Sequence, residues 1–286
     1  MAIHLVFITY NRLDYTKLAL ASVLADPNEE FRLTIWDNGS TDGTVEYLRN
    51  EVSDPRIADI IFSRENVGQT AAVNEVWSKS KADLLGKLDN DCLVTAGWTR
   101  ILAQAHADIP QLGVVACWHF RPDEFDYERA KHKIQTFGKH QIFRHPWTGG
   151  TGLLLKRDTF ERLGPMTGNT TTQYWLKMAS AGYINGYYYP LVYQEHMDYP
   201  WSEHYGFAGR FEEGLEVNAT SKSHGIRTVD DAKAWHQVVL KNILDDPWEA
   251  KYYVGWRAKL RNGVEKLTRM LRRLSNSHRH RGKSVI

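Results

Sequence analysis

The stretch LLGKLDND, residues 84–91, is an apolar run that ends in two acids, Asp89 and Asp91. A short buried strand with this ending sends both carboxylates beyond the edge of a sheet. Two oxygen ligands on one side can hold Mg²⁺ or Mn²⁺ and leave the other positions of the ion for waters and substrate phosphates. The alternative is an Asp-Asn turn that closes a strand, because both residue types are common in turns.

Strand and helix patterns alternate around this stretch. Residues 3–9 form a nearly continuous apolar run, typical of a strand buried on both faces of a parallel sheet. Further strands are predicted at residues 33–36, 57–62 and 84–88, and helices at residues 13–24, from 44 onward and at 70–79. This repetition predicts a parallel sheet with right-handed crossovers.

The second half of the chain is less regular. Its predicted elements are strands at 114–118 and 187–193, helices at 159–163 and 174–181, a charged loop or lid at 121–139, and a glycine-rich loop at 147–152. After about residue 230 the pattern becomes helical. We therefore expect an α/β domain over residues 1–225 and a helical basic extension over residues 226–286.

The composition is that of an ordinary globular protein, with 42% hydrophobic and 24% charged residues. No apolar run approaches the roughly 18 residues that a membrane span needs, and the N-terminus enters a strand pattern at once, which argues against a secretory signal. Two cysteines occur, Cys92 and Cys117, without a Cys-x-x-Cys spacing. We expect both cysteines to be small core residues of a cytoplasmic protein, rather than zinc ligands or nucleophiles.

Four polar clusters follow the predicted strands of the first half, at residues 9–12, 37–40, 64–68 and 89–91. In an open α/β sheet, ligands bind beyond the carboxyl ends of the strands. Four clusters at the same edge therefore predict one binding site there, and the joint pattern is more specific than any single cluster.

These clusters resemble the motifs of family-2 glycosyltransferases with the GT-A fold, over a region from Ile3 to about His196. Residues 9–12 and 37–44 are similar to the nucleotide-binding segments of the family, residues 66–74 to its next signature, residues 89–91 to its metal-binding motif, and residues 149–164 to the loop before its acceptor-side helix. The resemblance implies a Rossmann-like, mostly parallel sheet flanked by helices. It also implies a nucleoside diphosphate sugar as donor, with Mn²⁺ or Mg²⁺ as cofactor.

The resemblance also implies roles for single residues. Asp37 would accept a hydrogen bond from the imide N–H of uracil or thymine, and Asp91 would ligate the metal, with Asp89 facing the ribose or the metal. Asn66 and Gly68 would let the backbone approach the nucleotide, although Gly68 also suits a turn. The nucleotide-site residues expected on this basis are Thr9, Asn11, Arg12, Asp37, Asn38, Asn66, Gly68, Lys87, Asp89 and Asn90. For Arg12, a solvated surface role is the alternative.

His196 is a further candidate metal ligand beside Asp89 and Asp91. It follows the strand predicted at 187–193, where many GT-A enzymes have a metal-binding histidine, and an imidazole suits Mn²⁺ better than Mg²⁺. The surrounding acids and histidines, Glu195, Asp198, Glu203 and His204, favour a functional cluster. A satisfied structural histidine is the alternative.

The acceptor side departs from the family pattern. Inverting members carry a carboxylate pair near the start of the acceptor-side helix, one of which takes the proton of the attacking hydroxyl. Here Thr170, Thr171 and Gln173 stand in that place, and none can act as the base. The base would come from Asp198, Glu195 or Glu203, or sugar transfer proceeds with retention, or the enzyme is weakly active. We expect the acceptor to contact Trp147, Thr148, Gly149, Gly150 and Gln173.

The end of the chain is strongly basic. Residues 251–286 contain eleven Lys/Arg against one acid, Glu265, whereas the first 250 residues contain 25 Lys/Arg against 33 acids. Apolar residues at spacings of three and four predict an amphipathic basic helix. Residues 250–275 would form a dimer seam, contact an anionic membrane surface, or pack on their own domain. The acidic body and the lack of a recognition motif argue against nucleic acid.

The sequence thus predicts a cytoplasmic glycosyltransferase, peripheral at the inner face of the membrane if the basic helix binds lipid. It would transfer a sugar to a glycan or lipid-linked acceptor in bacterial surface polysaccharide synthesis. One alternative is a sugar nucleotidylyltransferase, although residues 9–12 lack the glycine-rich loop that such enzymes need after the first strand. The other is a non-catalytic module of the same fold that binds glycan or membrane.

Overall fold

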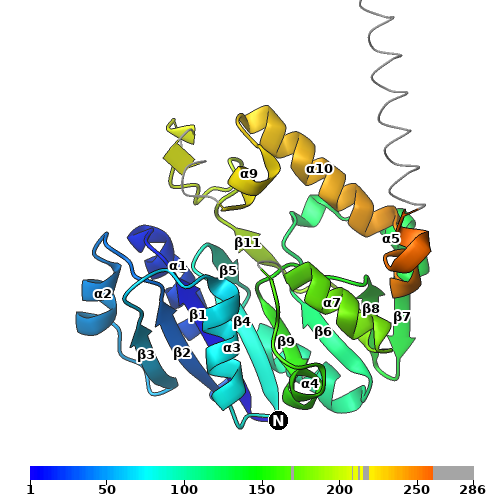
Figure 1. Ribbon diagram of the computed structural model, residues 1–286, viewed down its shortest axis with the longest axis horizontal. Helices are drawn as coiled ribbons and strands as arrows, with labels where there is room; N and C mark the ends of the chain where they lie inside the picture. Colours follow the sequence, from blue (N-terminus) through cyan, green and yellow to red (C-terminus); the bar gives the residue numbers. More distant parts are fainter. Residues whose placement is uncertain (169–170, 208, 212, 215–218, 260–286) are drawn as a thin grey trace, which may run out of the picture. The chain divides into compact units, whose positions relative to one another are not determined.

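The computed structural model describes residues 1–168, 171–207, 209–211, 213–214 and 219–259 of the chain (Figure 1). It divides into two compact units, Met1–Trp248 and Glu249–Ile286. Helix α10, Val229–Asp245, belongs to the first unit. The domain boundary expected after residue 225 stays a prediction, and the basic helix expected beyond residue 259 lies outside the described residues.

A nine-stranded sheet in the order β3-β2-β1-β4-β9-β6-β10-β8-β7 forms the centre of the first unit. Its first four strands are parallel and are β1 (Ile3–Thr9), β2 (Phe31–Asp37), β3 (Ile57–Phe62) and β4 (Leu84–Asp89). The strands predicted at residues 3–9 and 57–62 are confirmed with the same bounds. The apolar run of β1 is buried almost throughout, because strands lie on both of its sides and helices cover both faces of the sheet.

The second half of the sheet is mixed. Strand β9 (Leu153–Lys156) runs antiparallel between β4 and β6 (Leu112–Ala116). Strand β10 (Ile184–Tyr189) is parallel to β6, and an antiparallel pair, β8 (His140–Arg144) and β7 (Ile134–Phe137), closes the edge. The predicted mostly parallel sheet is therefore found, with antiparallel strands concentrated in its second half.

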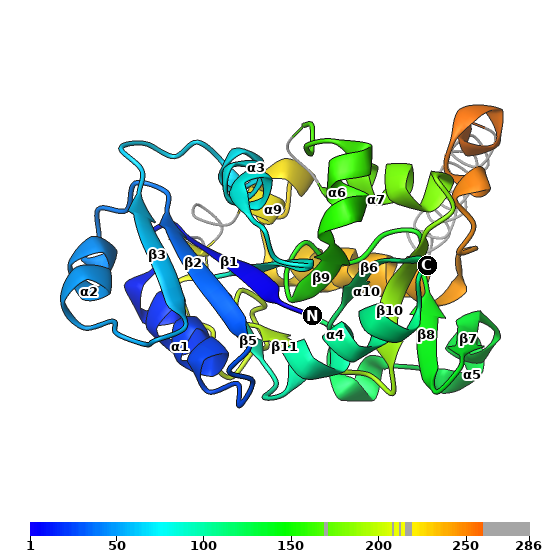
Figure 2. The ribbon, with the colours of Figure 1, turned by 90° about the horizontal axis from the view of Figure 1, so that it is seen from below.

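Helices cover both faces of the sheet (Figure 2). Helices α1 (Leu13–Leu24) and α4 (Trp98–Asp108) bury apolar residues in one cluster. Helices α3 (Gln69–Lys79), α6 (Arg157–Leu163) and α7 (Thr171–Ser180) contribute to the other cluster. The remaining helices are α2 (Thr44–Asn50), α5 (Tyr127–Ala130), α9 (Ala219–His224) and three short 3₁₀ helices, η1 (Pro122–Glu124), η2 (Lys131–Lys133) and η3 (Ala250–Tyr252). The expected three-layer α/β architecture is confirmed.

Three predictions for the second half were wrong in detail. The region 121–139 is not one loop, because residues 134–137 pair with β8 and form the edge strand of the sheet. The strand expected to reach residue 193 ends at Tyr189, since Pro190 has no N–H to continue the ladder. The helical pattern expected from about residue 230 to the end of the chain is interrupted, because helix α10 ends at Asp245 and the residue before Pro247 avoids the helical conformation.

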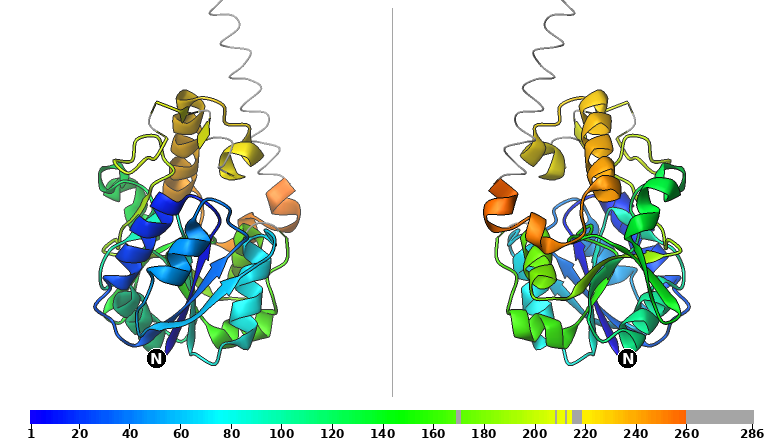
Figure 3. Two further views of the ribbon diagram at one scale, coloured as in Figure 1. Left: turned by 90° about the vertical axis from the view of Figure 1, so that its left-hand side faces the viewer. Right: turned by 90° about the vertical axis from the view of Figure 1, so that its right-hand side faces the viewer.

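A second, two-stranded sheet positions the region after β10. Strand β5 (Cys92–Val94) follows the acid motif directly, and β11 (Gln194–His196) pairs with it antiparallel, with Cys92 opposite His196. A backbone hydrogen bond from Met197 N to Asp91 O, 2.8 Å long, extends this pairing by one step. Helix α10 lies beyond the carboxyl ends of the parallel strands, at the end of the sheet opposite the N-terminus (Figure 3).

Candidate active site

The loops after β1 and β2 form one wall of the site. The amide of Asn11 donates to Ser40 Oγ at 2.7 Å, and the amide of Thr41 donates to Asn11 Oδ1 at 2.8 Å. Asn11 and Arg12 have positive φ angles, 53° and 61°, which residues other than glycine rarely adopt. Such backbone persists where its surroundings hold it, so the two loops fix each other's shape.

Asp37 and Asn38 make hydrogen bonds that stabilise the loops of this wall. The Asp37 side chain is fully buried, and its carboxylate accepts hydrogen bonds from Gly39 N (3.1 Å), Ser40 N (2.9 Å) and Ser40 Oγ (2.5 Å). Asn38 Oδ1 accepts from Val67 N at 3.0 Å and so ties the loop after β2 to the loop after β3. Both side chains shape the loops, and the expected contact of Asp37 with a base stays a prediction.

Thr9 and Asn90 lie beneath the wall in a buried polar network. Asn90 Nδ2 donates to Thr9 Oγ1 (3.2 Å), to Thr16 Oγ1 (3.0 Å) and to the carbonyl of Asn11 (2.9 Å), and the two hydroxyls are 2.9 Å apart. The network joins β1, α1 and the acid motif. In the structure these two predicted nucleotide-site residues therefore hold the loop after β1 and the acid motif in place.

Asn66 and Gly68 form the rim after β3. The exposed Asn66 accepts a hydrogen bond from Gly68 N at 2.9 Å, an Asx-turn, and Gly68 has a φ of 82°. A Cβ atom at Gly68 would meet no atom within 4 Å, so the backbone angle, rather than lack of space, requires glycine. Gly68 thus forms a turn, which was the alternative considered for it. Its contact with a nucleotide stays a prediction.

The two acids of the motif have different partners. Lys87 Nζ lies 2.6 Å from each oxygen of Asp89 and 2.7 Å from the carbonyl of Gly150. The Lys87 side chain is 1% exposed and that of Asp89 16%. The pair is a buried ion pair, and it ties the acid motif to the glycine-rich loop 147–152. Asp89 was a predicted metal ligand, but its carboxylate is engaged by a lysine.

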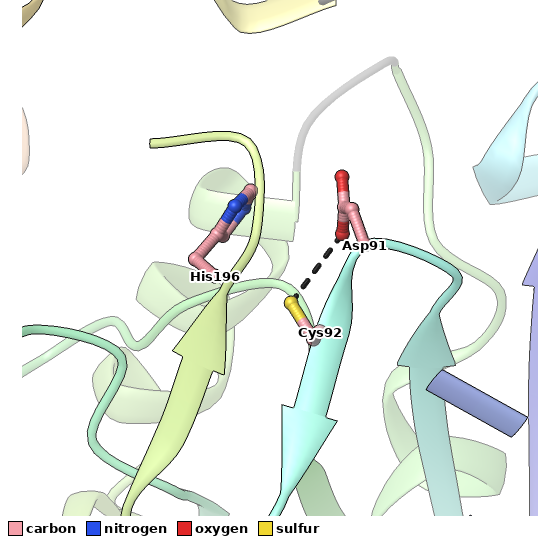
Figure 4. Close-up of side chains that lie close together, drawn as sticks. All are labelled: Asp91, Cys92 and His196. Atoms are coloured by element: carbon pink, nitrogen blue, oxygen red, sulfur yellow. Dashed lines mark hydrogen bonds between the residues drawn. The ribbon is translucent and has the colours of Figure 1, made fainter. Parts of the chain in front are cut away.

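The side chains of Asp91, Cys92 and His196 converge, with one ligand atom of each within 4.8 Å of the others (Figure 4). His196 Nδ1 is buried and has no hydrogen-bond partner among the residues that the structure describes. An unpartnered imidazole nitrogen beside a carboxylate fits a divalent ion such as Mn²⁺. Cys92 Sγ donates to Asp91 Oδ1 at 3.3 Å, and burial raises the pKa of the thiol well above its usual range. Cys92 therefore stays protonated and orients Asp91.

Cys92 and Cys117 are both buried, as expected. The contribution of Cys92 to this cluster was not predicted, because a lone cysteine after an acid carries no recognisable signal.

Arg12 supplies a positive charge to the same cluster. Its Nη1 lies 2.6 Å from Asp198 Oδ1 and 3.5 Å from Asp91 Oδ2. Burial opposes ionisation of Arg12, but the two carboxylates raise its pKa, so it is a permanent cation. Burial likewise acts to raise the pKa of Asp91, but His196 and Arg12 outweigh it and lower the pKa to about 2. Asp91 is therefore ionised and able to bind a metal at neutral pH.

Glu195 lies in a separate group of side chains. Its carboxylate accepts hydrogen bonds from Ser202 Oγ (2.5 Å) and pairs with His204 Nδ1 (2.9 Å). Burial acts to raise the pKa of Glu195, but these partners outweigh it and lower the pKa. The predicted cluster after β10 is thus divided between Asp198 at the Arg12 pair and Glu195 at His204.

The sequence model of the family described as Glycosyl transferase family 2 matches residues 5–170. The chain belongs to this family. It is a glycosyltransferase, as the motifs at the strand ends predicted. No curated protein sequence matches the chain.

Solved structures share the fold of this family-2 glycosyltransferase. The mannosyltransferase PcManGT from Pyrobaculum calidifontis, in complex with GDP-Man and Mn²⁺, has a TM-score of 0.57 at 20% identity, over 85% of this chain and 71% of that one. GalNAc-T7 with UDP, GalNAc and Mn²⁺ has a TM-score of 0.53 at 14% identity, over 85% and 57% of the two chains. TarS from S. aureus has a TM-score of 0.51 at 14% identity, over 86% and 44%. The GT-A fold is confirmed.

On the acceptor side of the glycosyltransferase, the glycine-rich loop packs closely. Trp147 lies edge-on to His145, with ring centroids 4.3 Å apart, and Thr148 is buried. A Cβ atom at Gly149 would come within 2.9 Å of His119 Nδ1, so only glycine fits there. Gln173 is exposed on α7, and Thr170 lies outside the described residues.

One part of the site of this glycosyltransferase carries no recognisable sequence motif. His196 stacks on Tyr199 (4.8 Å between ring centroids), and His236 of α10 lies edge-on to Tyr199 (4.8 Å). His236 Nε2 is also 2.9 and 3.0 Å from the two oxygens of Glu124 in η1. Helix α10 thus packs against the aromatic group that supports the candidate metal ligand.

A pocket adjoins Asp198, between the segment after β11 and helices α9 and α10. Its wall includes four aromatic side chains, Tyr199, Tyr205, Phe211 and Trp235. His196 and Asp198 also line it. The pocket therefore adjoins the metal-ligand cluster on the side of α9 and α10.

Replacing Lys87 by methionine tests the buried ion pair. Lys87→Met leaves the Asp89 carboxylate buried without its cation, so we expect a loss of about 3–5 kcal/mol of unfolding free energy. The double variant Lys87→Met/Asp89→Asn removes the stranded charge and should recover most of this loss. Urea denaturation of the wild type and both variants measures it. A loss below about 1 kcal/mol in the single variant would show that water solvates Asp89 without the lysine.

Proposed function

We propose that this glycosyltransferase transfers a sugar from a nucleoside diphosphate donor to a hydroxyl of a glycan or lipid-linked acceptor. The observation that carries the proposal is the pair Asp91 and His196, a carboxylate beside an unpartnered buried imidazole nitrogen, at the end of the strands where the loops after β1 and β2 meet. This pair would hold a divalent ion, Mn²⁺ or Mg²⁺. When bound, such an ion neutralises charge on the departing diphosphate.

The donor would lie along the loops that Asn11, Ser40 and Gly68 shape. PcManGT binds GDP-Man with Mn²⁺ and GalNAc-T7 binds UDP with Mn²⁺, which supports a nucleotide and a metal in the corresponding place here. Asp37, Asn66 and the Gly68 backbone would contact the nucleotide directly. Thr9, Asn38 and Asn90 would support the loops. Asp89, held by Lys87, would face the ribose, and the metal would be left to Asp91 and His196.

The acceptor would enter between the glycine-rich loop and the pocket beside Asp198. Tyr205, Phe211 and Trp235 would contact it on the pocket side, and Trp147, Thr148, Gly149, Gly150 and Gln173 would form the opposite side. Among the acids considered as general base, Asp198 lies in the metal-ligand cluster, whereas Glu195 is bonded to Ser202 and His204. Asp198 is therefore our candidate base if the sugar is transferred with inversion; transfer with retention needs none.

The second unit would attach the enzyme to a surface. Trp256 is 68% exposed and Val254 44%, and both lie among the cations Lys251, Arg257 and Lys259. Exposed aromatic residues with lysine and arginine suit the interface of an anionic membrane. None of the helices in the described part of the chain is both long and apolar enough to cross a bilayer. We propose peripheral contact at the inner face of a bacterial membrane, in surface polysaccharide synthesis; a homodimer through residues 250–275 is the alternative.

Release of nucleoside diphosphate tests the proposed reaction. The enzyme is incubated with UDP-, GDP- and dTDP-sugars and Mn²⁺, and we expect nucleoside diphosphate to be released from at least one donor and release to stop when EDTA removes the metal. Asp91→Asn should abolish the release and leave the Tm nearly unchanged, because the variant removes one of two acids that share Arg12.

The matched control is Asp123→Asn, which changes an exposed acid that pairs with Arg121, and it should release nucleotide like the wild type. If no donor is hydrolysed and no nucleotide binds in the presence of metal, the proposed function is wrong. If Asp91→Asn unfolds, the acid is structural.

Truncation at Trp248 tests the role of the second unit. A chain of residues 1–248 keeps the first compact unit complete. We expect the truncated chain to stop co-sedimenting with vesicles that contain anionic lipid. Light scattering should show the same oligomeric state as for the full chain. A drop from dimer to monomer would favour the dimer seam instead, and no change in either measurement would mean that the segment packs on its own domain.

A further inference from the structure

Arg12 lies between two carboxylates at the metal-ligand cluster. Its Nη1 is 2.6 Å from Asp198 Oδ1 and 3.5 Å from Asp91 Oδ2. The three side chains are 16%, 5% and 14% exposed in the order Arg12, Asp198, Asp91. Water therefore screens these charges weakly, and each charge strongly affects what binds beside it.

The position of Arg12 is fixed from several sides. Its left-handed backbone, with φ 61° and ψ 54°, immediately precedes α1. The guanidinium carbon lies 5.6 Å from the centroid of the Tyr15 ring. Tyr15 Oη in turn donates to the carbonyl of Met197 (3.0 Å) and accepts from Gly206 N (2.8 Å). The start of α1 thus holds the segment that carries Asp198, and the cation cannot leave the acids without loosening this segment.

Arg12 adds one positive charge beside Asp91 and Asp198, whereas Asp89 has its own cation in Lys87. A positive charge at this position repels a divalent cation and attracts the phosphates of a nucleotide. Removal of the Arg12 charge should therefore strengthen binding of the metal and weaken binding of the diphosphate.

We propose that Arg12 is a fixed counter-charge that weakens binding of the metal alone and strengthens binding of the diphosphate to the metal-loaded site. The inference rests on the proposed function for the identity of its diphosphate ligand. Arg12 is in this respect a specificity-determining residue for an anionic ligand, a role different from the contact with base and ribose that the family resemblance implied.

Arg12→Gln tests the proposal, because it removes the charge and keeps hydrogen-bonding groups. Calorimetry with Mn²⁺ alone, and then with UDP and GDP at saturating Mn²⁺, gives two dissociation constants. At the short distances in this cluster we expect shifts of about tenfold or more, with the Kd for Mn²⁺ lowered and the Kd for nucleotide raised. Arg12→Lys keeps the charge and should stay within about threefold of the wild type in both measurements.

A purely structural role for Arg12 would weaken both ligands together, so opposite shifts distinguish the two. Arg121→Gln, which removes an exposed arginine paired with Asp123, is the control and should change neither constant. Equal weakening of both ligands by Arg12→Gln, or no change in either, would overturn the proposal. If the wild type binds Mn²⁺ but neither nucleotide, the proposed donor class fails, and the direction of the Mn²⁺ shift still decides the role of Arg12.

Asp198→Asn provides the second variant if Arg12→Gln does not fold. It removes the carboxylate nearest to Arg12 and leaves the guanidinium beside Asp91 alone, so the expected shifts reverse: the Kd for Mn²⁺ rises and the Kd for nucleotide falls. Shifts of the same sign for both ligands would again contradict the counter-charge.

Discussion

His196 reaches the acid motif because β11, three residues long, pairs with β5 directly after Asp91. The register sets Cys92 opposite His196, and the hydrogen bond from Met197 N to Asp91 O holds the next step of the ladder at 2.8 Å. A shift by one residue would turn His196 to the other face of the sheet, away from Asp91. The candidate metal ligands, the Arg12 pair with Asp198 and the stacking of Tyr199 all depend on this short pairing.

Two ion pairs divide the charges at the strand ends. Lys87 binds both oxygens of Asp89 and the carbonyl of Gly150, so the first acid of the motif serves to join the glycine-rich loop to β4. Asp91 is left beside the imidazole of His196, with Arg12 at 3.5 Å. The two acids therefore differ in role although they are two residues apart. One is committed to structure, and the other is ionised and available.

The sequence predicted the parts of this arrangement that local pattern determines. The apolar run of residues 3–9 is confirmed as β1, and the polar clusters after β1 to β4 lie at one edge, because the carboxyl ends of parallel strands meet there. It could not predict partners that tertiary packing supplies. Arg12 and Asp198 are 186 residues apart in the chain, and His236 and Glu124 are 112 apart. Nothing local marks these pairs.

The central claim is that Asp91 and His196, rather than both acids of the motif, hold the metal that binds the diphosphate. Crystals grown with Mn²⁺ and UDP test it directly, because manganese gives an anomalous difference peak that locates the ion. The account predicts a peak in contact with the Asp91 carboxylate and the His196 imidazole, while Lys87 still binds Asp89. A peak on Asp89 with His196 unliganded would contradict it.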